Sequence, residues 1–349
     1  RNIIRESLER GIRRSLPEPV SRLTDSKGKP LFQVIMKYSE PIACVGAACG
    51  NELVLTDEAP CVLFGVFDFG GGTADYSFGM YRNADVDTEG YEEALELFGV
   101  DGDDAFGGEI LIDKITYWIL TSEKNKEKVI NAGIPFEKPE DELTEDGFGN
   151  LIQSTIAARA NVRRISEMVS RPFFEGTKAE KVQFASDVYK EDKETKRTEY
   201  KGSASCNITD LFSIQTNGYV SLDLDIEFDE LYSKLETLFK SKCMVFSQSM
   251  EQAFSTQNAI EKLNKAGISD PKSCIKIIMA GNGSRHPMVR KHLEELFGSE
   301  EGRIFLIGEN SNHIEKNRYQ ITPKTAVAIG ALNLSRMKVC QPVDLSIIY

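Results

Sequence analysis

The sequence is short of the residues that most zinc sites and hydrolytic triads use. Its 349 residues include only three histidines, and its seven cysteines are odd in number and form no C-x-x-C pair. A structural zinc site needs several Cys or His ligands, and a Ser-His-Asp triad needs a histidine base. We therefore expect neither kind of site. We interpret the cysteines as small buried hydrophobic residues in a reducing compartment, the cytoplasm.

Positive charge and long apolar runs are also scarce. Lys and Arg number 42 against 54 Asp and Glu, which gives a net charge of −12. Nucleic acids and anionic membranes are polyanions, so we expect neither as a partner. No apolar run approaches the roughly 18 residues of a membrane span. The composition, with 41% hydrophobic residues, is typical of a globular protein. The length of 349 residues is sufficient for two sizeable cores. Because the chain begins at Arg1, we interpret it as a piece of a longer protein.

A run of glycines between two apolar segments is the most informative feature of the chain. Val62 to Phe67 has the length and composition of a strand buried on both faces, and it ends on Asp68. Glycine lets backbone N–H groups approach a ligand, and successive N–H groups in a turn form an anion-binding concavity. A carboxylate beside a phosphate loop suits Mg²⁺. These residues alone also fit an ordinary hairpin turn. The glycines are Gly70, Gly71 and Gly72, followed by Thr73 and a second strand-like segment from Ala74.

The segment D-F-G-G-G-T-A-D-Y-S resembles the second phosphate-binding hairpin of the actin, sugar-kinase and heat-shock ATPase superfamily. It is most similar to D-L-G-G-G-T-x-D-x-S of the seventy-kilodalton heat-shock chaperones (DnaK type). The resemblance implies that the glycine N–H groups hold the phosphates of ATP or ADP. It also implies that Asp68 orients metal-bound or attacking water, that Thr73 and Asp75 support it, and that Asp68 and Asp75 belong to a Mg²⁺ site.

Two further segments resemble phosphate-side elements of the same family, in the same order. Glu40, in S-E-P-I-A-C, matches the glutamate of N-E-P-T-A-A, a connecting helix beside the nucleotide; on its own it is also a normal first-turn residue of a helix. G-D-D-A-F-G-G-E is similar to G-D-x-x-L-G-G-E, which holds the phosphates from the other side of the cleft. Gly107, Gly108 and Glu109 end this segment. An exposed N-terminus of the following helix, 110–120, would add favourable partial charge.

Three further parts of the chain resemble later elements of the family: a loop and a helix on the adenosine side of its site, and the helix that closes its ATPase domain. G-N-G-S-R-H-P is similar to G-G-S-T-R-x-P, whose glycines lie against the nucleoside and whose arginine lies against adenine. A helix predicted over 151–170 carries the paired basic residues that would flank adenosine, and 322–331 resembles the helix that closes the ATPase domain, with Thr322 as its cap. The implied adenosine contacts are Gly281, Asn282, Gly283, Ser284, Arg285, Arg163 and Arg164.

The remaining segments are predicted from periodicity alone. Residues 1–16 form an amphipathic helix whose basic face either docks on an acidic partner or is solvated. The acidic stretch 83–104 is expected to be a surface loop or short helix. Strands are expected over 31–37, 220–227, 275–280 and 303–307, a hairpin over 181–189 and 199–206, and helices over 42–48, 228–263 and 288–297.

The resemblance implies an α/β fold, with an actin-like (ribonuclease H-like) ATPase lobe whose mixed sheet is flanked by helices, and a smaller α+β subdomain. Residues 1–55 are expected to be a remnant of the first lobe and the connecting helix. Residues 56–120 and 265–340 would form the second lobe, 121–264 the smaller subdomain, and 341–349 a tail.

The expected function is the ATP-binding portion of a chaperone-like or actin-like ATPase. The family's first phosphate hairpin, D-x-G-T-T, and the lysine after it have no counterpart in the sequence. Hydrolysis would therefore require that hairpin, and the chain alone would bind nucleotide weakly. Expected partners are nucleotide and proteins such as a client, a co-chaperone-like factor or a first lobe. The alternatives are a non-catalytic interaction scaffold, an actin-like filament protein and a small-molecule kinase.

Overall fold

The computed structural model describes residues 2–31, 38–85, 90–184, 188–192, 196–309, 321–322 and 325–340. Most of the predicted strand 31–37, and the tail 341–349, lie outside the described residues. No helix within the described ranges is long and apolar enough to cross a lipid bilayer.

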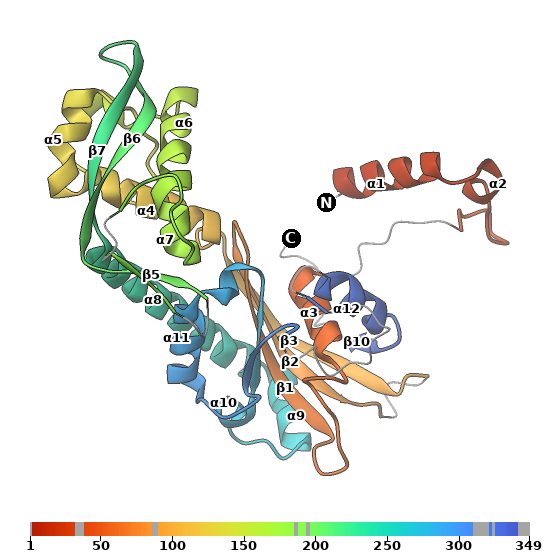
Figure 1. Ribbon diagram of the computed structural model, residues 1–349. Coiled ribbons are helices and arrows are strands. Elements are labelled where there is room, and N and C mark those ends of the chain that lie inside the picture. The colour runs from red at the N-terminus through yellow and green to blue at the C-terminus, as the bar shows by residue number, and fades with distance from the viewer. Residues whose placement is uncertain are drawn as a thin grey trace.

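A mixed six-stranded sheet forms the centre of the molecule, in the order β10-β3-β2-β1-β8-β9 (Figure 1). β1, β2 and β3 are consecutive antiparallel strands, whereas β8 and β9 run parallel to β1 and to each other, and β10 runs parallel to β3. The fold is therefore α/β with a mixed sheet, as predicted. The bounds are β1 (Cys61–Phe69), β2 (Ala74–Asn83), β3 (Glu93–Asp103), β8 (Lys276–Ala280), β9 (Ile304–Leu306) and β10 (Lys338–Cys340).

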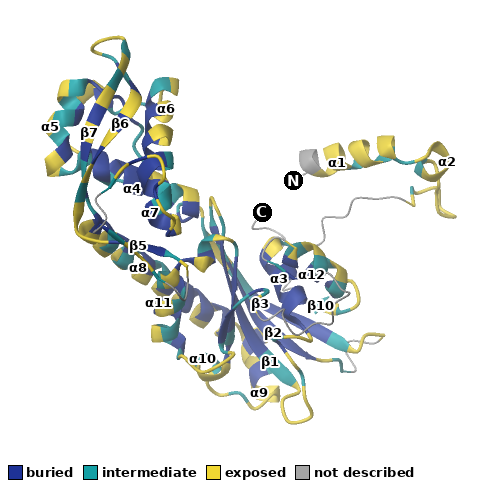
Figure 2. Ribbon diagram, in the orientation of Figure 1, coloured by how far each residue is buried: buried dark blue, intermediate teal, exposed yellow. Residues whose placement is uncertain are grey.

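Both faces of the sheet are covered by helices, which explains the nearly continuous apolar run in β1. Phe64 and Val66 pack into one core with α3 (Glu40–Ala48) and α12 (Ala326–Leu334). Leu63 and Phe67 point to the other face, where α8, α9 and α11 lie. Figure 2 shows the buried strands between these two layers. The second layer consists of α8 (Phe228–Phe254), α9 (Gln257–Lys265) and α11 (Pro287–Phe297), with the short α10 (Pro271–Cys274) before β8.

A smaller α+β part lies at the upper end of α8 in Figure 1. It contains two two-stranded antiparallel sheets, β4-β5 and β6-β7. β7 alternates as predicted, because Leu222, Leu224 and Ile226 are buried and the intervening side chains face outward. The elements are α4 (Gly108–Thr121), α5 (Glu123–Ala132), α6 (Ile156–Ile165), a π-helical turn (Ser166–Ser170), α7 (Arg171–Glu175), β4 (Tyr189–Glu191), β5 (Thr198–Tyr200), β6 (Ser203–Ser213) and β7 (Gly218–Glu227).

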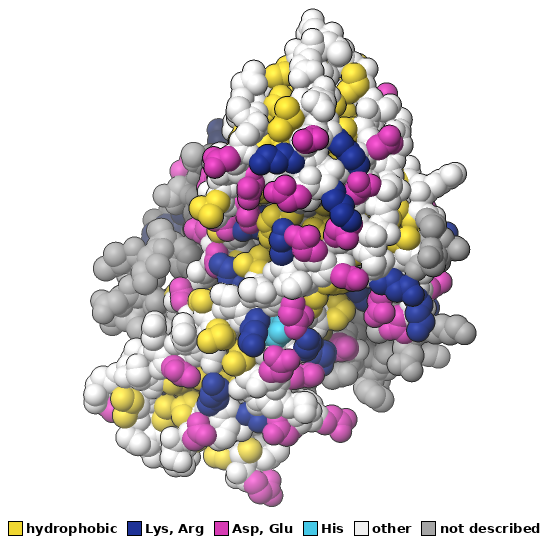
Figure 3. Space-filling model, turned by 90° about the vertical axis from the view of Figure 1, so that its left-hand side faces the viewer, with side chains coloured by type: hydrophobic (Ala, Val, Ile, Leu, Met, Phe, Trp, Pro, Cys, Tyr) yellow, Lys and Arg dark blue, Asp and Glu magenta, His cyan; other side chains and the backbone are white. Residues whose placement is uncertain are grey.

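The outer surface of this part and of the α8–α11 layer carries interspersed charges of both signs (Figure 3). Neighbouring side chains form ion pairs, as between Lys234 and Glu230 and between Lys291 and Glu236. Such exposed pairs contribute little to stability. This face therefore shows no field of a single sign that would attract a charged macromolecule.

Some boundary predictions are wrong, and each error has a local cause. The acidic stretch 83–104 is not a loop or short helix, because it contains the eleven-residue strand β3. The helix predicted from residue 151 begins at Ile156, after a 3₁₀ turn, Gly149–Leu151. The last helix begins at Ala326 with Thr325 as its cap, although Thr322 was the expected cap.

Two small helices, α1 (Asn2–Ser15) and α2 (Glu18–Ser21), stand apart from the sheet in Figure 1. The predicted amphipathic helix is confirmed. Its apolar side chains remain accessible, with Leu8 51% and Ile12 41% exposed.

Candidate functional site

Asp68 is the acid at the centre of the candidate site. It lies one residue before the end of β1, on the α3 side of the sheet, and its side chain is buried although the strand ends beside it. Burial, followed by the charges of Glu40 and Asp75, raises the pKa of the Asp68 carboxyl to about 7. Thr73 Oγ1 donates to Asp75 Oδ2 over 2.9 Å. The carboxylates of Asp68, Glu40 and Asp75 are therefore close enough to repel one another, and a bound cation would relieve this repulsion.

The glycine hairpin presents unused backbone donors. Gly70 N–H donates to Thr73 O over 2.9 Å, which closes the turn. The N–H groups of Gly71, Gly72 and Thr73 have no backbone acceptor among the residues that the structure describes. None of the three glycines has a positive φ. An added Cβ would lie 3.5 Å from its nearest neighbour at Gly70, 3.7 Å at Gly71, and in open space at Gly72. The chain itself therefore does not require glycine here, whereas a closely approaching ligand would.

The first turn of α4 is joined to this hairpin, so the exposed helix N-terminus that the sequence suggested is not found. Gly108 N–H donates to Gly70 O over 3.0 Å, and Glu109 N–H donates to Gly71 O over 2.8 Å. Gly107 packs so closely that a Cβ would lie 2.3 Å from Gly72 C. The hairpin carbonyls thus serve as the cap of α4. The partial positive charge of this helix end is directed at the hairpin itself.

The loop after β8 packs against the end of β1, as the parallel pairing of these strands requires. Gly281 has φ +76°, and a Cβ there would lie 2.4 Å from Phe69 O; at Gly283 it would lie 2.6 Å from the Phe69 ring. Ser284 is buried, and its Oγ donates to Ala280 O. Arg285 is exposed and forms no ion pair with any described residue. The loop is fixed by its own packing, and Arg285 is its available cation.

Two adjoining cavities bring most of the predicted residues together. The larger, of about 870 Å³, lies over Asp68, and the smaller, of about 300 Å³, continues past the hairpin toward α7. Gly70, Gly71, Asn282 and Arg285 line both. The larger cavity is also lined by Glu40, Asp68, Thr73, Asp75, Gly281 and Thr322, and the smaller by Gly108, Glu109 and Gly283.

Five predicted residues do not line these two cavities. Gly72 and Gly107 form the contact between the hairpin and α4, and Ser284 is part of the loop's internal bonding. Arg163 lies on a different cavity, between α4 and α6. Arg164 points the other way and pairs with Asp210 over 2.8 Å.

The sequence reasoning missed an aromatic wall. Phe174, on α7, lines the smaller cavity and stacks on His286, whose ring also stacks on Phe239, with centroid separations of 5.0 and 4.8 Å. Burial, followed by the charge of Arg197, lowers the pKa of His286 to about 3. The imidazole is therefore neutral and behaves as an aromatic spacer. Phe174 lies just beyond the predicted helix 151–170, and no sequence pattern there distinguishes it from an ordinary core aromatic residue.

Arg171 connects this wall to the hairpin side. It binds Glu109 through both carboxylate oxygens, over 2.6 and 2.9 Å, and also contacts Glu167 and Glu175. The side-chain hydrogen bond from Arg171 lowers the pKa of Glu109. Glu109 is thus held by the protein and is not a free ligand group.

Among the described residues, no group of three or more His, Cys, Asp or Glu side chains is arranged to hold a metal ion by itself. Asp68 and Asp75 nevertheless suit Mg²⁺, which commonly combines one or two carboxylates with water and phosphate oxygens. In comparisons with known proteins, no family model and no curated protein matches the chain.

Proposed function

We propose that the chain binds a nucleoside di- or triphosphate, ATP or ADP, together with Mg²⁺, and that its fold is the actin-like ATPase lobe that the sequence resembles. The phosphates lie against the N–H groups of Gly71 and Thr73, which line the larger cavity. Asp68 and Asp75 bind the Mg²⁺ on one side of the cleft, and Glu40 lies opposite them. The base extends past Arg285 toward Phe174, where stacking on a flat ring is favourable.

One observation carries the proposal. The backbone N–H groups of Gly71 and Thr73 have no backbone partner among the described residues, and both residues line the 870 Å³ cavity beside a buried carboxyl whose pKa is about 7. Unpaired N–H groups suit an anion, and crowded carboxylates suit a cation. A phosphate–Mg²⁺ pair supplies both charges at once, which neither an isolated anion nor an isolated cation would do.

Hydrolysis by these 349 residues alone should be negligible. Phosphoryl transfer depends on positioning and on charge stabilisation from all sides of the phosphates. The sequence holds one glycine hairpin of this kind, and the D-x-G-T-T hairpin is not among its residues. We expect a dissociation constant weaker than micromolar, which means less than about 8 kcal/mol of binding free energy.

Thermal unfolding with and without Mg-ATP or Mg-ADP tests the proposal, supported by isothermal titration. Ligand that binds only the folded chain raises the unfolding temperature. The rise should disappear in Asp68→Asn and Arg285→Ala, and it should shrink when EDTA removes Mg²⁺. Arg336→Ala, at an exposed position outside the cavities, is the matched control.

Two results would count against the proposal or part of it. If neither nucleotide changes unfolding of the wild-type chain, the scaffold alternative is favoured. Micromolar affinity would contradict the requirement for a second hairpin while leaving the site itself intact.

A further inference from the structure

A separate cavity of about 690 Å³ lies between α4, the loop 137–141 and α6. Ile110 and Val162 form apolar parts of its lining. Two almost fully exposed apolar side chains flank it in the chain: Leu143 (85% exposed) follows the lining loop by two residues, and Ile156 (86%) follows the lining residue Ser154 by two. Single exposed apolar side chains are common on protein surfaces, so these two indicate an interaction surface only in combination with the charge of the cavity.

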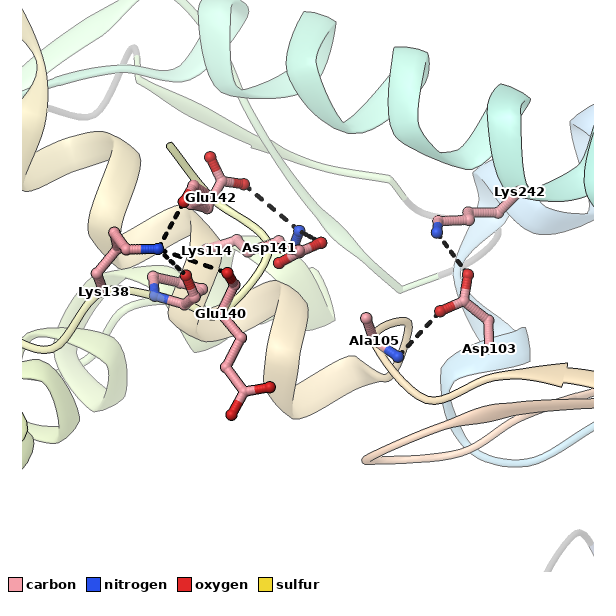
Figure 4. Close-up of polar contacts among 9 residues, drawn as sticks. Asp103, Ala105, Lys114, Lys138, Glu140, Asp141, Glu142 and Lys242 are labelled. Atoms are coloured by element: carbon pink, nitrogen blue, oxygen red, sulfur yellow. Dashed lines mark hydrogen bonds and ion pairs between the residues drawn. The ribbon is translucent and has the colours of Figure 1, made fainter. Parts of the chain in front are cut away.

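The loop at this cavity is held in place by two lysines (Figure 4). Lys114, on α4 and buried, forms ion pairs with Asp141 and Glu142. Lys138 donates to the carbonyl oxygens of Pro139, over 3.0 Å, and Glu142, over 2.6 Å. Tyr117 Oη also donates to Leu143 O over 2.7 Å. The cavity wall is therefore pre-organised, which lowers the entropic cost of binding a partner.

The charges left over in this cavity are mostly negative. Seven acidic and four basic residues line it. Arg159 is paired with Glu137, and Arg171 with Glu109 and Glu167. Asp104, Asp113 and Glu140 have no cation within ion-pair distance among the described side chains, whereas two lining cations, Lys138 and Arg163, have no carboxylate partner there, which leaves a negative balance. The surface therefore favours a basic occupant.

The chain itself carries a segment with matching chemistry. Its first 31 residues hold eight Lys or Arg against four Asp or Glu, although the whole chain has a net charge of −12. On α1, Leu8 and Ile12 form an exposed apolar stripe, and Arg10 and Arg14 are exposed on the same helix. A helix of this length is marginal in water on its own and gains most of its stability from packing its apolar face.

We propose that this acidic cavity docks the basic amphipathic helix α1 of a second copy of the chain. Leu8 and Ile12 cover Leu143 and Ile156, and the arginines of α1 face Asp113 and Glu140. Each copy offers one helix and one cavity, so reciprocal docking closes a two-fold dimer with both apolar faces covered.

Sedimentation velocity of the full chain over a range of concentrations tests this. We expect a dimer whose dissociation constant is roughly micromolar and whose affinity falls as salt is added, because the contact is electrostatic. Arg10→Glu/Arg14→Glu and, separately, Asp113→Lys/Glu140→Lys should each weaken it by about tenfold or more. Glu58→Lys, at an exposed position away from the cavity, should not.

Mixing the two charge-reversed variants tests directly whether complementary charges form the dimer contact. Each variant then offers the group that the other needs, so the mixture should sediment as a heterodimer while each variant alone is a monomer. This rescue cannot be produced by misfolding. A monomeric wild-type chain at all concentrations, dimers unaffected by both reversals, or a mixture that stays monomeric would overturn the proposal.

Discussion

Glycine is required at different positions of the candidate site for different physical reasons. Gly107, Gly281 and Gly283 are required by the packing of the chain, since a Cβ at each would lie less than 3.0 Å from neighbouring atoms. Gly71 lines both cavities and has no positive φ, and a Cβ there would lie 3.7 Å from its nearest neighbour. Under the proposed function, glycine is needed at this position because the ligand approaches its backbone closely. The two kinds of glycine cannot be told apart in the sequence, where both appear simply as glycine-rich motifs.

Substituting each kind separates folding from binding. Gly107→Ala should lower the free energy of unfolding by about 1–3 kcal/mol, because the new methyl group collides with the backbone of the hairpin. Gly71→Ala should leave the free energy of unfolding within about 0.5 kcal/mol of wild type and abolish stabilisation by Mg-ADP. Urea denaturation with and without nucleotide measures both. Retained nucleotide binding in Gly71→Ala would contradict the placement of the phosphates at the hairpin.

The buried carboxyl of Asp68 predicts an unusual pH dependence. Its folded-state pKa of about 7 lies above the unfolded value of about 3.9. The folded chain therefore holds the proton more tightly, and the contribution of this group to stability falls as pH rises from about 4 to 7. Asp68→Asn removes this loss. Urea denaturation measures this as the free energy of unfolding of the variant minus that of wild type. This difference should be about 2 kcal/mol larger at pH 8 than at pH 5.5.

The matched control is Asp57→Asn, at an exposed loop position. It should show the same difference from wild type at both pH values. A pH-independent effect of Asp68→Asn would mean that the carboxylate is already balanced by a group in the protein, and the argument for a cation beside it would fail.

At the scale of elements, α3 and α12 cross at two glycines, and this crossing positions Glu40. A Cβ on Gly330 would lie 1.6 Å from Ala43 O, and one on Gly46 would lie 2.6 Å from Gly330 O. Asn333 Nδ2 donates to Gly46 O over 3.0 Å. Backbone contact of this kind leaves no room for a side chain. The first residue of α3, Glu40, is thus held over the cavity by a helix from the other end of the chain.

Gly330→Ala should therefore be among the most damaging conservative changes in the chain. We expect a loss of about 3 kcal/mol in the free energy of unfolding, because backbone atoms and not a flexible side chain must move. Ala328→Leu, on an exposed position of the same helix, is the control and should be nearly neutral. Equal unfolding midpoints for the two variants would show that the helices can separate without cost.

The sequence predicted those elements whose pattern is carried by apolar periodicity. β1, β7 and β8 and the helices α3 and α11 lie within a few residues of expectation. β3 was missed because the nine acids of the stretch 83–104, four of them in β3 itself, suggested a solvated loop. In the structure one of these acids, Glu96, is buried against Arg82 and Lys262, and Asp103 is paired with Lys242. Charge counting fails where tertiary partners neutralise the charge.

At the scale of the whole molecule, the sequence indicated which residues of the cleft would meet but not what surrounds them. Glu40, Asp68 and Arg285 line one cavity, as the resemblance implied. The ring stack of Phe174, His286 and Phe239 and the capping of α4 by hairpin carbonyls were not predictable. They depend on how α7 and α8 approach the sheet, which no local pattern determines. The cavity at the loop 137–141 was missed for the same reason.

The crossing of α3 and α12 also has a consequence in time. Gly46 and its partner Asn333 are 287 residues apart in the chain. A ribosome that adds about 5–20 residues per second needs roughly 15 to 60 s to make the second helix after the first. During that interval α3 can pack on β1 but lacks its partner helix α12, and for most of it the sheet also lacks β8 and β9. The core between α3 and α12 therefore stays incomplete until α12 has been made, and only then does this crossing support Glu40 over the cavity.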